Sequence, residues 1–391
     1  MASASGRSAG EPSRVELFGD LTPWSEPAWY STLSSPYYND GHRKLRKYIR
    51  EYFDEKVLPY ADEWEENGQV PQEWRVETGV HAGLSTASIV GLPPIIDHGT
   101  DEQKGRWLPG VLKGETSFCL GATEPTGGSD LANLKTTARK TADGRHYIVN
   151  GHKKWITLAM DCSHMTTAVR TGGPGAGGIS VLVIDTKSPG ISMRMIHNSG
   201  VNAARSVWVT MEDVMVPAEN LLGVENQGFH VLMSNFNKER YVMAVSMNRK
   251  TRTCLSIATR YAHDRVTFGQ PLIANQIIRH KLASIGAEVE SHWAWLEQLT
   301  YHVKLHGWTN ELASRIALAK VLGGNMLERA VREAQQILGG AGYQRGGIGG
   351  QVEQISRDLR MMVVGGGSEE IIADLAVRRE IAQAKRKGAM L

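Results

Sequence analysis

The chain has 391 residues, more than one hydrophobic core usually takes, so two or three domains are expected. Hydrophobic residues make up 41% and charged residues 22% of it, which is typical of a soluble globular protein. A formal net charge of +3 is too small to indicate nucleic-acid binding, and no apolar run is long enough to span a membrane. Cys119, Cys162 and Cys254 are isolated and form no CxxC pattern, which indicates a reducing compartment and no metal site.

The two ends of the chain show no clear targeting signal. Residues 1–25, rich in Ser, Ala and Gly at their start, are predicted to be disordered. They lack the apolar core of a signal peptide and mix acidic with basic residues, unlike a transit peptide. Ala389-Met390-Leu391 is only a loose match to a peroxisomal address. A mitochondrial, a peroxisomal and a cytoplasmic location therefore all stay open.

An N-terminal helical domain is predicted over 26–115. Apolar residues at helical spacing predict one helix over about 42–66. Thr100-Asp101-Glu102-Gln103 has the pattern of a capped helix start, and Pro109 and Gly114 are expected to end that helix.

A β domain is predicted over 116–225, because short β-type runs alternate there with Gly, Asn and Asp. It is expected to be a small barrel or sandwich. The runs 146–149 and 154–157 flank Asn150-Gly151, which is a strong hairpin signal. Further strands are predicted over 180–184 and from 206 toward 216.

Helical periodicity returns at Gly228 and persists, with short Gly-rich turns between the segments. Four helices are predicted, over about 228–263, 275–306, 309–338 and 368–386. Helices of this length packed antiparallel form a four-helix bundle, which is assigned to 226–391. The order along the chain is helical, β and helical, which predicts an α+β fold.

Glu239, early in the first of these helices, is a candidate proton-abstracting base. Apolar residues at spacings of three or four share its side of the helix: Phe229, Leu232, Met233, Phe236, Met243 and Met247. A carboxylate among apolar neighbours loses solvation in its charged form, which raises its pKa and makes it a stronger base. The alternative is an ordinary ion pair with Lys238, Arg240 or a more distant cation.

The segment Thr123–Asp130, taken alone, is a turn whose Gly-Gly-Ser run lets backbone N–H groups approach a ligand. Together with its surroundings it closely resembles the acyl-CoA dehydrogenase family. The matching segments, in family order and at family spacing, are 123–130, 150–157, 212–220, 228–229, 265–269, 336–343 and 357–358. The resemblance implies an FAD-dependent enzyme with helical, β-barrel and four-helix domains, assembled as a homodimer or homotetramer.

The resemblance also implies which residues bind the flavin ring. Thr123 and Thr157 match hydroxyl groups that bond the ring, Thr157 toward N5. Trp155 matches the aromatic residue packed near the isoalloxazine, and Ala122 matches a backbone contact to its pyrimidine end.

Arg265 and Phe268, with Gln336 and Gly340, look like the neighbouring subunit's contacts to the pyrophosphate and adenosine. An Arg fork suits a pair of pyrophosphate oxygens. The alternatives are a surface charge for Arg265 and a Gly-capped helix end for Gln336 and Gly340.

Ser368 and Glu370 also match positions that contact FAD in the family. Glu370 and its neighbour Glu369 are rival carboxylates to Glu239, and both are interpreted as first-turn helix residues favoured by the helix dipole.

The catalytic base departs from the pattern of most of the family, which carries it as a Glu in a loop before the last helix. Alignment from Arg357-Asp358 places Gly366 at that position. The isovaleryl-CoA and long-chain members carry the base in a Glu-Arg pair on the first bundle helix instead, and Glu239-Arg240 matches that pair.

The resemblance then implies a mechanism. Glu239 removes the α-proton of an acyl-CoA while the β-hydride moves to flavin N5. The N–H of Gly366 and the flavin ribityl hydroxyl donate to the thioester oxygen as in an oxyanion hole. Ser129 and Arg240 are candidate CoA contacts, with an interhelical salt bridge as the alternative for Arg240. An electron-transferring flavoprotein would be the acceptor.

A second departure is a shortened N-terminal domain, in which residues 78–84 join almost directly to the Pro93-Pro94 region where the family has a few dozen more residues. Other interpretations stay open: a flavin acyl oxidase, a desaturase of carrier-bound acyl groups, or a catalytically silent flavoprotein scaffold.

Overall fold

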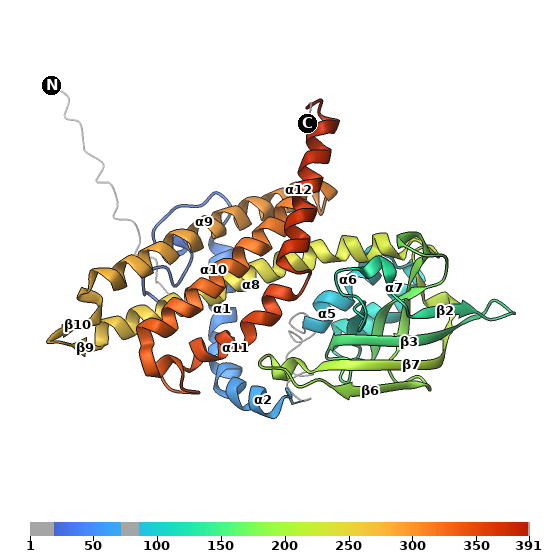
Figure 1. Cartoon of the computed structure of the whole chain (residues 1–391), viewed down its shortest axis with the longest axis horizontal. Helices are drawn as coiled ribbons and strands as arrows, with labels where there is room; N and C mark the ends of the chain where they lie inside the picture. Colours follow the sequence, from blue (N-terminus) through green and yellow to red (C-terminus); the bar gives the residue numbers. More distant parts are fainter. Residues whose placement is uncertain (1–18, 72–85, 390–391) are drawn as a thin grey trace, which may run out of the picture.

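The computed structural model describes residues 19–71 and 86–389 (Figure 1). Three groups of elements follow one another: N-terminal helices, a central sheet and a C-terminal bundle of long helices. The α+β architecture expected from the sequence is confirmed, while the domain boundaries near 115 and 225 stay a prediction. No helix in the described ranges combines the length and the apolar content that a membrane crossing needs.

The first helices are shorter than predicted because a proline interrupts them. Where the sequence predicted one helix over about 42–66, α1 (Asp40–Lys56) is followed by a 3-10 turn at Leu58–Tyr60 and then by α2 (Ala61–Asn67). Pro59 has no N–H for the helical hydrogen-bond pattern, so the α-helix is interrupted there. The junction predicted at 78–84 lies outside the described residues.

Contrary to the prediction of disorder over 1–25, residues 19–25 pack against the long C-terminal helices. Trp24 contacts the main hydrophobic cluster of the bundle. Its carbonyl oxygen accepts a hydrogen bond from Arg252 Nη1 at 2.9 Å. An aromatic side chain and a buried Arg donor thus anchor this part of the chain.

Three short helices lead into the sheet: α5 (Thr86–Gly91), α6 (Pro93–His98) and α7 (Asp101–Leu112). The capping box predicted at the start of α7 is confirmed. Thr100 Oγ1 accepts from Gln103 N at 3.2 Å, and Gln103 Oε1 accepts from Thr100 N at 2.9 Å. The helix ends between Pro109 and Gly114, as expected.

The central region is one connected eight-stranded sheet in the order β6-β7-β3-β2-β4-β5-β8, with β1 paired to β4. Its strands are β1 (Phe118–Gly121), β2 (Thr137–Lys140), β3 (His146–Thr157), β4 (His164–Arg170), β5 (Ile179–Asp185), β6 (Ile191–Met195), β7 (Ser206–Pro217) and β8 (Leu221–Leu222). The strands predicted from the runs starting at 180 and 206 are β5 and β7. β1 and β4 are parallel, whereas β3, β7 and β6 are neighbours in antiparallel order.

The hairpin predicted at Asn150-Gly151 is wrong, because β3 runs straight through it. Asn150 Nδ2 donates to Asp213 Oδ1 of β7 at 2.9 Å, and the pairing of β3 with β7 shifts register between Val149 and Gly151. The dipeptide therefore forms a β-bulge. The β2–β3 hairpin instead turns at Asp143-Gly144, which carries the same turn signal.

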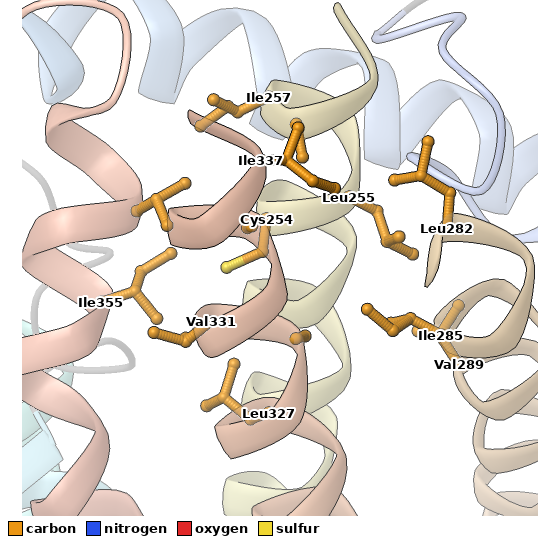
Figure 2. Close-up of a cluster of buried hydrophobic side chains, with 14 of the residues drawn as sticks. Cys254, Leu255, Ile257, Leu282, Ile285, Val289, Leu327, Val331, Ile337 and Ile355 are labelled. Atoms are coloured by element: carbon orange, nitrogen blue, oxygen red, sulfur yellow. The ribbon is translucent and has the colours of Figure 1, made fainter. Parts of the chain in front are cut away.

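The C-terminal region consists of α8 (Gly228–Asp264), α9 (Gln276–His306), α10 (Ala313–Leu338), α11 (Gly350–Val364) and α12 (Glu369–Arg386). The four predicted helices are confirmed, and α11 is an addition that the sequence analysis missed. Figure 2 shows the core of the bundle, where Cys254 of α8, Val331 of α10 and Ile355 of α11 converge, with Leu282 of α9 beside them. α8 and α10 share the most extensive helix contact, so α8 is a central helix of the bundle.

Candidate active site

α8 connects the sheet to the bundle and carries Glu239 between them. It begins at Gly228, where a Cβ would come within 2.6 Å of the Ser180 backbone in β5. Leu232 then packs in one hydrophobic cluster with Ala122, the residue that follows β1. Glu239 lies seven residues beyond Leu232, about 10 Å along the helix. The helix that carries the candidate base therefore shares a hydrophobic cluster with the first residue of the loop that follows β1.

Glu239 is buried, with 8% of its surface exposed. Burial raises its pKa to about 8, and the nearby charge of Arg240 opposes this rise. The ion pairs that were the alternative are not formed with its neighbours in sequence. Lys238 pairs with Asp97, and Arg240 Nε donates to Gly366 O at 2.7 Å. A carboxyl group with such a pKa can exchange a proton near neutral pH.

Asn235, one helical turn before Glu239, holds one oxygen of its carboxylate. Asn235 Nδ2 donates to Glu239 Oε1 at 2.6 Å and to Val90 O of α5 at 2.8 Å. Its own Oδ1 is buried and has no hydrogen-bond partner among the described residues. Asn235 was not among the predicted site residues, although helices bring together an Asn and a Glu four positions later.

The linker between α11 and α12 brings Gly366 to the same part of α8. Gly366 has φ +66°, which favours glycine, and a Cβ there would lie 3.2 Å from Met243 Sδ and 3.4 Å from Arg240 Cγ. Met243 is one turn after Glu239. The structure thus brings Gly366 against Arg240 and Met243, the residues that follow Glu239 on α8, while the match of Gly366 to the family position of the usual base stays a prediction. Contact of the buried Arg240 with CoA stays a prediction.

The residues proposed to face the flavin ring also gather in one place. Lys154 N donates to Thr123 O at 2.9 Å, which joins the loop after β1 to the end of β3 that carries Trp155 and Thr157. Trp155 has φ +64°, an unusual value for a bulky residue, and about half of the residue's surface is exposed. Such strain at an exposed aromatic residue is a sign of a functional position.

A buried ion pair links β3 to the loop that contains Thr123. Lys153 Nζ lies 2.8 Å from Glu124 Oε1, and Glu124 also accepts from Thr136 N at 2.9 Å. Burial alone would raise the pKa of Glu124, but Lys153 and the hydrogen bonds outweigh it and lower that pKa. Burial lowers the pKa of Lys153 to about 8. This pair was not predicted from the sequence, because its residues lie 29 positions apart and no local pattern joins them. Ser129, farther along the loop, is exposed.

A surface hollow of about 550 Å³ lies at the end of α10. Gln336, Gly339, Gly342 and Tyr343 are among the residues that line it, and Gly340 is exposed in the 3-10 turn Gly339–Gly342 between them. Two of the four residues predicted to hold the dinucleotide, Gln336 and Gly340, therefore meet at one hollow or its rim.

The other two, Arg265 and Phe268, lie on the short β9–β10 hairpin (Val266–Thr267 and Gln270–Pro271) that follows α8. Both are exposed, and Phe268 is fully so. α8 has 37 residues, which makes it about 55 Å long. Figure 1 shows the hairpin and the sheet at opposite ends of the molecule. Within one chain, one small cofactor cannot touch both Phe268 and Thr157.

The start of α12 matches the interpretation given from the sequence. Glu369 and Glu370 lie in its first turn, and Ser368 is its N-cap residue. Glu370 is exposed. Burial lowers the pKa of Lys320 to about 8, and the negative charge of Glu369 opposes this shift.

Comparison with known proteins matches most of the chain to one family. Residues 74–115, 119–214 and 226–381 match the profiles described as acyl-CoA dehydrogenase N-terminal, middle and C-terminal domains. "Acyl-CoA dehydrogenase AFT10-1" of Alternaria alternata is 38% identical over 420 aligned positions, covering 93% of this chain and 97% of that protein. "Acyl-CoA dehydrogenase apdG" of Emericella nidulans is 37% identical and covers 91% and 94%.

A solved structure agrees with these relatives. A probable acyl-CoA dehydrogenase from Mycobacterium abscessus superposes with a TM-score of 0.81 at 32% identity, covering 89% of this chain and 99% of that one. The alignment with AFT10-1 is longer than the 391 residues of this chain. AFT10-1 therefore has residues within the aligned region that this chain lacks. With all three regions matched in order, the chain belongs to the acyl-CoA dehydrogenase family and is an oxidoreductase that acts on acyl-CoA.

Proposed function

We propose that this chain catalyses the FAD-dependent α,β-dehydrogenation of an acyl-CoA thioester with Glu239 as the base. The observation that carries the proposal is the buried Glu239 carboxyl, whose pKa is raised to about 8, on the stretch of α8 whose Arg240 and Met243 lie against Gly366. The sequence has Gly366 at the family position of the usual base, and in this proposal Glu239 of α8 supplies the carboxyl instead.

The residues present fit FAD. Trp155 is an exposed aromatic platform held at a strained backbone position, and the partly buried hydroxyl residues Thr123 and Thr157 flank it. The hollow at Gln336 offers space and polar groups for the adenosine end. When bound, FAD supplies the acceptor for the β-hydride and passes the electrons on, which we expect to go to an electron-transferring flavoprotein.

In this mechanism Glu239 takes the α-proton of the thioester. The electron pair of the Cα–H bond becomes the Cα=Cβ double bond as the β-hydrogen leaves with its own pair. The Gly366 N–H donates to the thioester oxygen, where negative charge develops. Asn235 holds Glu239 Oε1, which leaves Oε2 to receive the proton.

The deprotonated form of Glu239 is the active base, so kcat/KM should rise with pH through about 8. Arg265 and Phe268 complete the site from a second copy of the chain. The place of their hairpin at the opposite end of the molecule from the sheet that carries Thr157 supports this arrangement.

Anaerobic titration of the FAD-loaded protein with branched, medium-chain and long-chain acyl-CoAs tests the proposal. We expect bleaching of the flavin absorbance with at least one of them. The E239Q variant should keep FAD and lose bleaching, because the amide cannot take the proton. Bleaching of E239Q at the wild-type rate would remove Glu239 from the mechanism.

The same titration separates the other interpretations. Rapid oxygen consumption with substrate would identify an acyl oxidase, and reduction only by a carrier-bound acyl group would identify a desaturase. A protein that holds FAD but is reduced by none of these thioesters would be a silent scaffold.

A further inference from the structure

Lys320 of α10 is a buried lysine for which the proposed mechanism has no role. Only 1% of its surface is exposed, and lysine is almost never this deeply buried without partners. Its Nζ donates to two backbone carbonyls, Val363 O and, at 3.0 Å, Gly367 O. Burial lowers its pKa to about 8. A group that costs this much to bury needs a structural or functional reason.

The two carbonyls bracket the glycine linker of the candidate site. Val363 is in the last turn of α11, and Gly367 directly precedes the N-cap of α12. Between them, Gly366 O accepts from Arg240 Nε at 2.7 Å. Two cationic side chains from α8 and α10 thus bind two carbonyls of this short linker and one in the helical turn before it, and charge-assisted hydrogen bonds of this kind are among the stronger ones.

In this linker, hydrogen bonds fix two peptide groups and leave the peptide group between them without one among the described residues. On one side Gly365 N donates to Met361 O at 2.8 Å, and on the other side Arg240 holds Gly366 O. The peptide group between them carries the Gly366 N–H, which has no acceptor within 19–71 and 86–389. Three consecutive glycines are conformationally permissive, so without such contacts this N–H would sample many directions.

We propose that Lys320 is a positioning residue that, together with Arg240, aims the Gly366 N–H at the thioester oxygen. The inference rests on the proposed function. Lys320 does not touch the substrate and acts through the linker. It differs from a purely structural lysine because its loss should slow the chemical step more than it weakens substrate binding.

K320M tests this, because methionine has a similar volume and no donor. Removal of one oxyanion donor costs about 10²–10³ in rate. Here the donor is only misdirected, so the rate of flavin reduction should fall about 10- to 100-fold. The dissociation constant of acyl-CoA should change less than about 3-fold, since most of its binding surface is untouched. K320Q keeps an NH₂ donor and should recover part of the rate.

S314A is the matched control. Ser314 is fully buried on the same helix, and its Oγ donates to Glu380 Oε1 of α12 at 2.5 Å. The variant loses a buried bond between α10 and α12 without touching the linker, so it should lower the melting temperature and leave the rate of flavin reduction within about 2-fold. An equal loss of rate in S314A and K320M, or a wild-type rate in K320M, would overturn the inference.

A second measurement needs no turnover and separates this inference from the proposed function. Acetoacetyl-CoA cannot be dehydrogenated at its α,β-bond in this way, but its enolate places negative charge on the thioester oxygen. Its apparent pKa for enolisation on the FAD-loaded enzyme, read from its ultraviolet absorbance, should be about one unit higher in K320M than in wild type.

The two measurements distinguish failure of the proposed function from failure of the role assigned to Lys320. Wild-type protein that stabilises the enolate but is reduced by no acyl-CoA would refute the proposed function and leave the role of Lys320 standing. Wild-type protein that dehydrogenates acyl-CoA, with K320M stabilising the enolate equally well, would refute the role of Lys320. Should K320M fail to fold, K320Q carries both measurements.

Discussion

Protonation of Glu239, the group proposed to take the substrate proton, is linked to the free energy of unfolding. Its pKa is about 8 in the folded protein against an ordinary value of 4.5. The folded state therefore binds the proton more tightly than the unfolded state, and the free energy of unfolding falls as pH rises from about 4.5 to about 8. A pKa difference of this size corresponds to at most about 5 kcal/mol.

The E239Q variant should not show this loss of stability with rising pH, because it has no carboxyl group to ionise at this position. We expect the variant and wild type to have similar urea midpoints at pH 5. At pH 9 E239Q should be the more stable protein by several kcal/mol, because its neutral amide stays buried without charge. Unfolding curves of the two proteins at both pH values measure the difference, and a constant difference across this range would show that the carboxyl is not buried as described.

The role of Asn235 can be tested through the same carboxyl group. Its hydrogen bond to Glu239 Oε1 favours the charged form, so N235L should raise the pKa of Glu239 further. The pH at which kcat/KM reaches half its maximum should move up by about one unit, which is the worth of one hydrogen bond to a charged group. N237L is the control, since Asn237 is a buried Asn on the same helix that makes no hydrogen bond to Glu239. A shift of equal size in N237L would contradict the assignment.

At this scale the burial and raised pKa of Glu239 could be predicted from the sequence but its partners could not, and its role as the base stays a prediction. Helical periodicity placed Glu239 on an apolar face, and its burial with a raised pKa confirms that argument. The contact with Val90 and the three carbonyls held by Lys320 and Arg240 depend on how distant segments pack, and no local pattern encodes such contacts.

At the scale of the elements, one dipeptide shows why a strong local signal can fail. Asn150-Gly151 and Asp143-Gly144 both favour a hairpin turn, and only the second one forms it. The side chain of Asn150 is paired with Asp213 of β7, so β3 continues past the dipeptide as a bulged strand. Both dipeptides favour a turn, and the pairing of β3 with β7 determines which of them forms it. α11 was not predicted for a related reason, because the Gly-rich stretches at both of its ends indicate turns.

The bulge makes Gly151 far less replaceable than the true turn glycine. Gly151 has φ +145°, and a Cβ there would lie 2.6 Å from Thr136 Oγ1. G151A should therefore lose about 3–5 kcal/mol of stability, from backbone strain and overpacking together. Gly144 has φ +71° and open space around it, so G144A should lose only about 1–2 kcal/mol. Urea denaturation compares the two variants, and equal losses would indicate that the turn and the bulge have been exchanged.

At the scale of the whole molecule, the length of α8 separates the two halves of the proposed cofactor site. Trp155 and Thr157 lie in the sheet near one end of this helix, whereas Arg265 and Phe268 follow its other end (Figure 1). A cofactor held by both pairs must bridge two copies of the chain, in which case FAD binding and association are thermodynamically coupled.

Mixed dimers test this arrangement directly. A T123V/T157V variant lacks the hydroxyls of the flavin half, and an R265A/F268A variant lacks the hairpin contacts, so each alone should retain little FAD. In a dimer that contains one copy of each, the chain with the intact flavin half faces the intact hairpin of its partner. Half of the sites are therefore restored, and differently tagged copies purified as a pair should carry about half of the wild-type flavin absorbance. If the hairpin instead served the site of its own chain, every site in the mixed dimer would lack one half. The pair would then stay as empty as dimers of either variant alone, which are the controls purified in the same way.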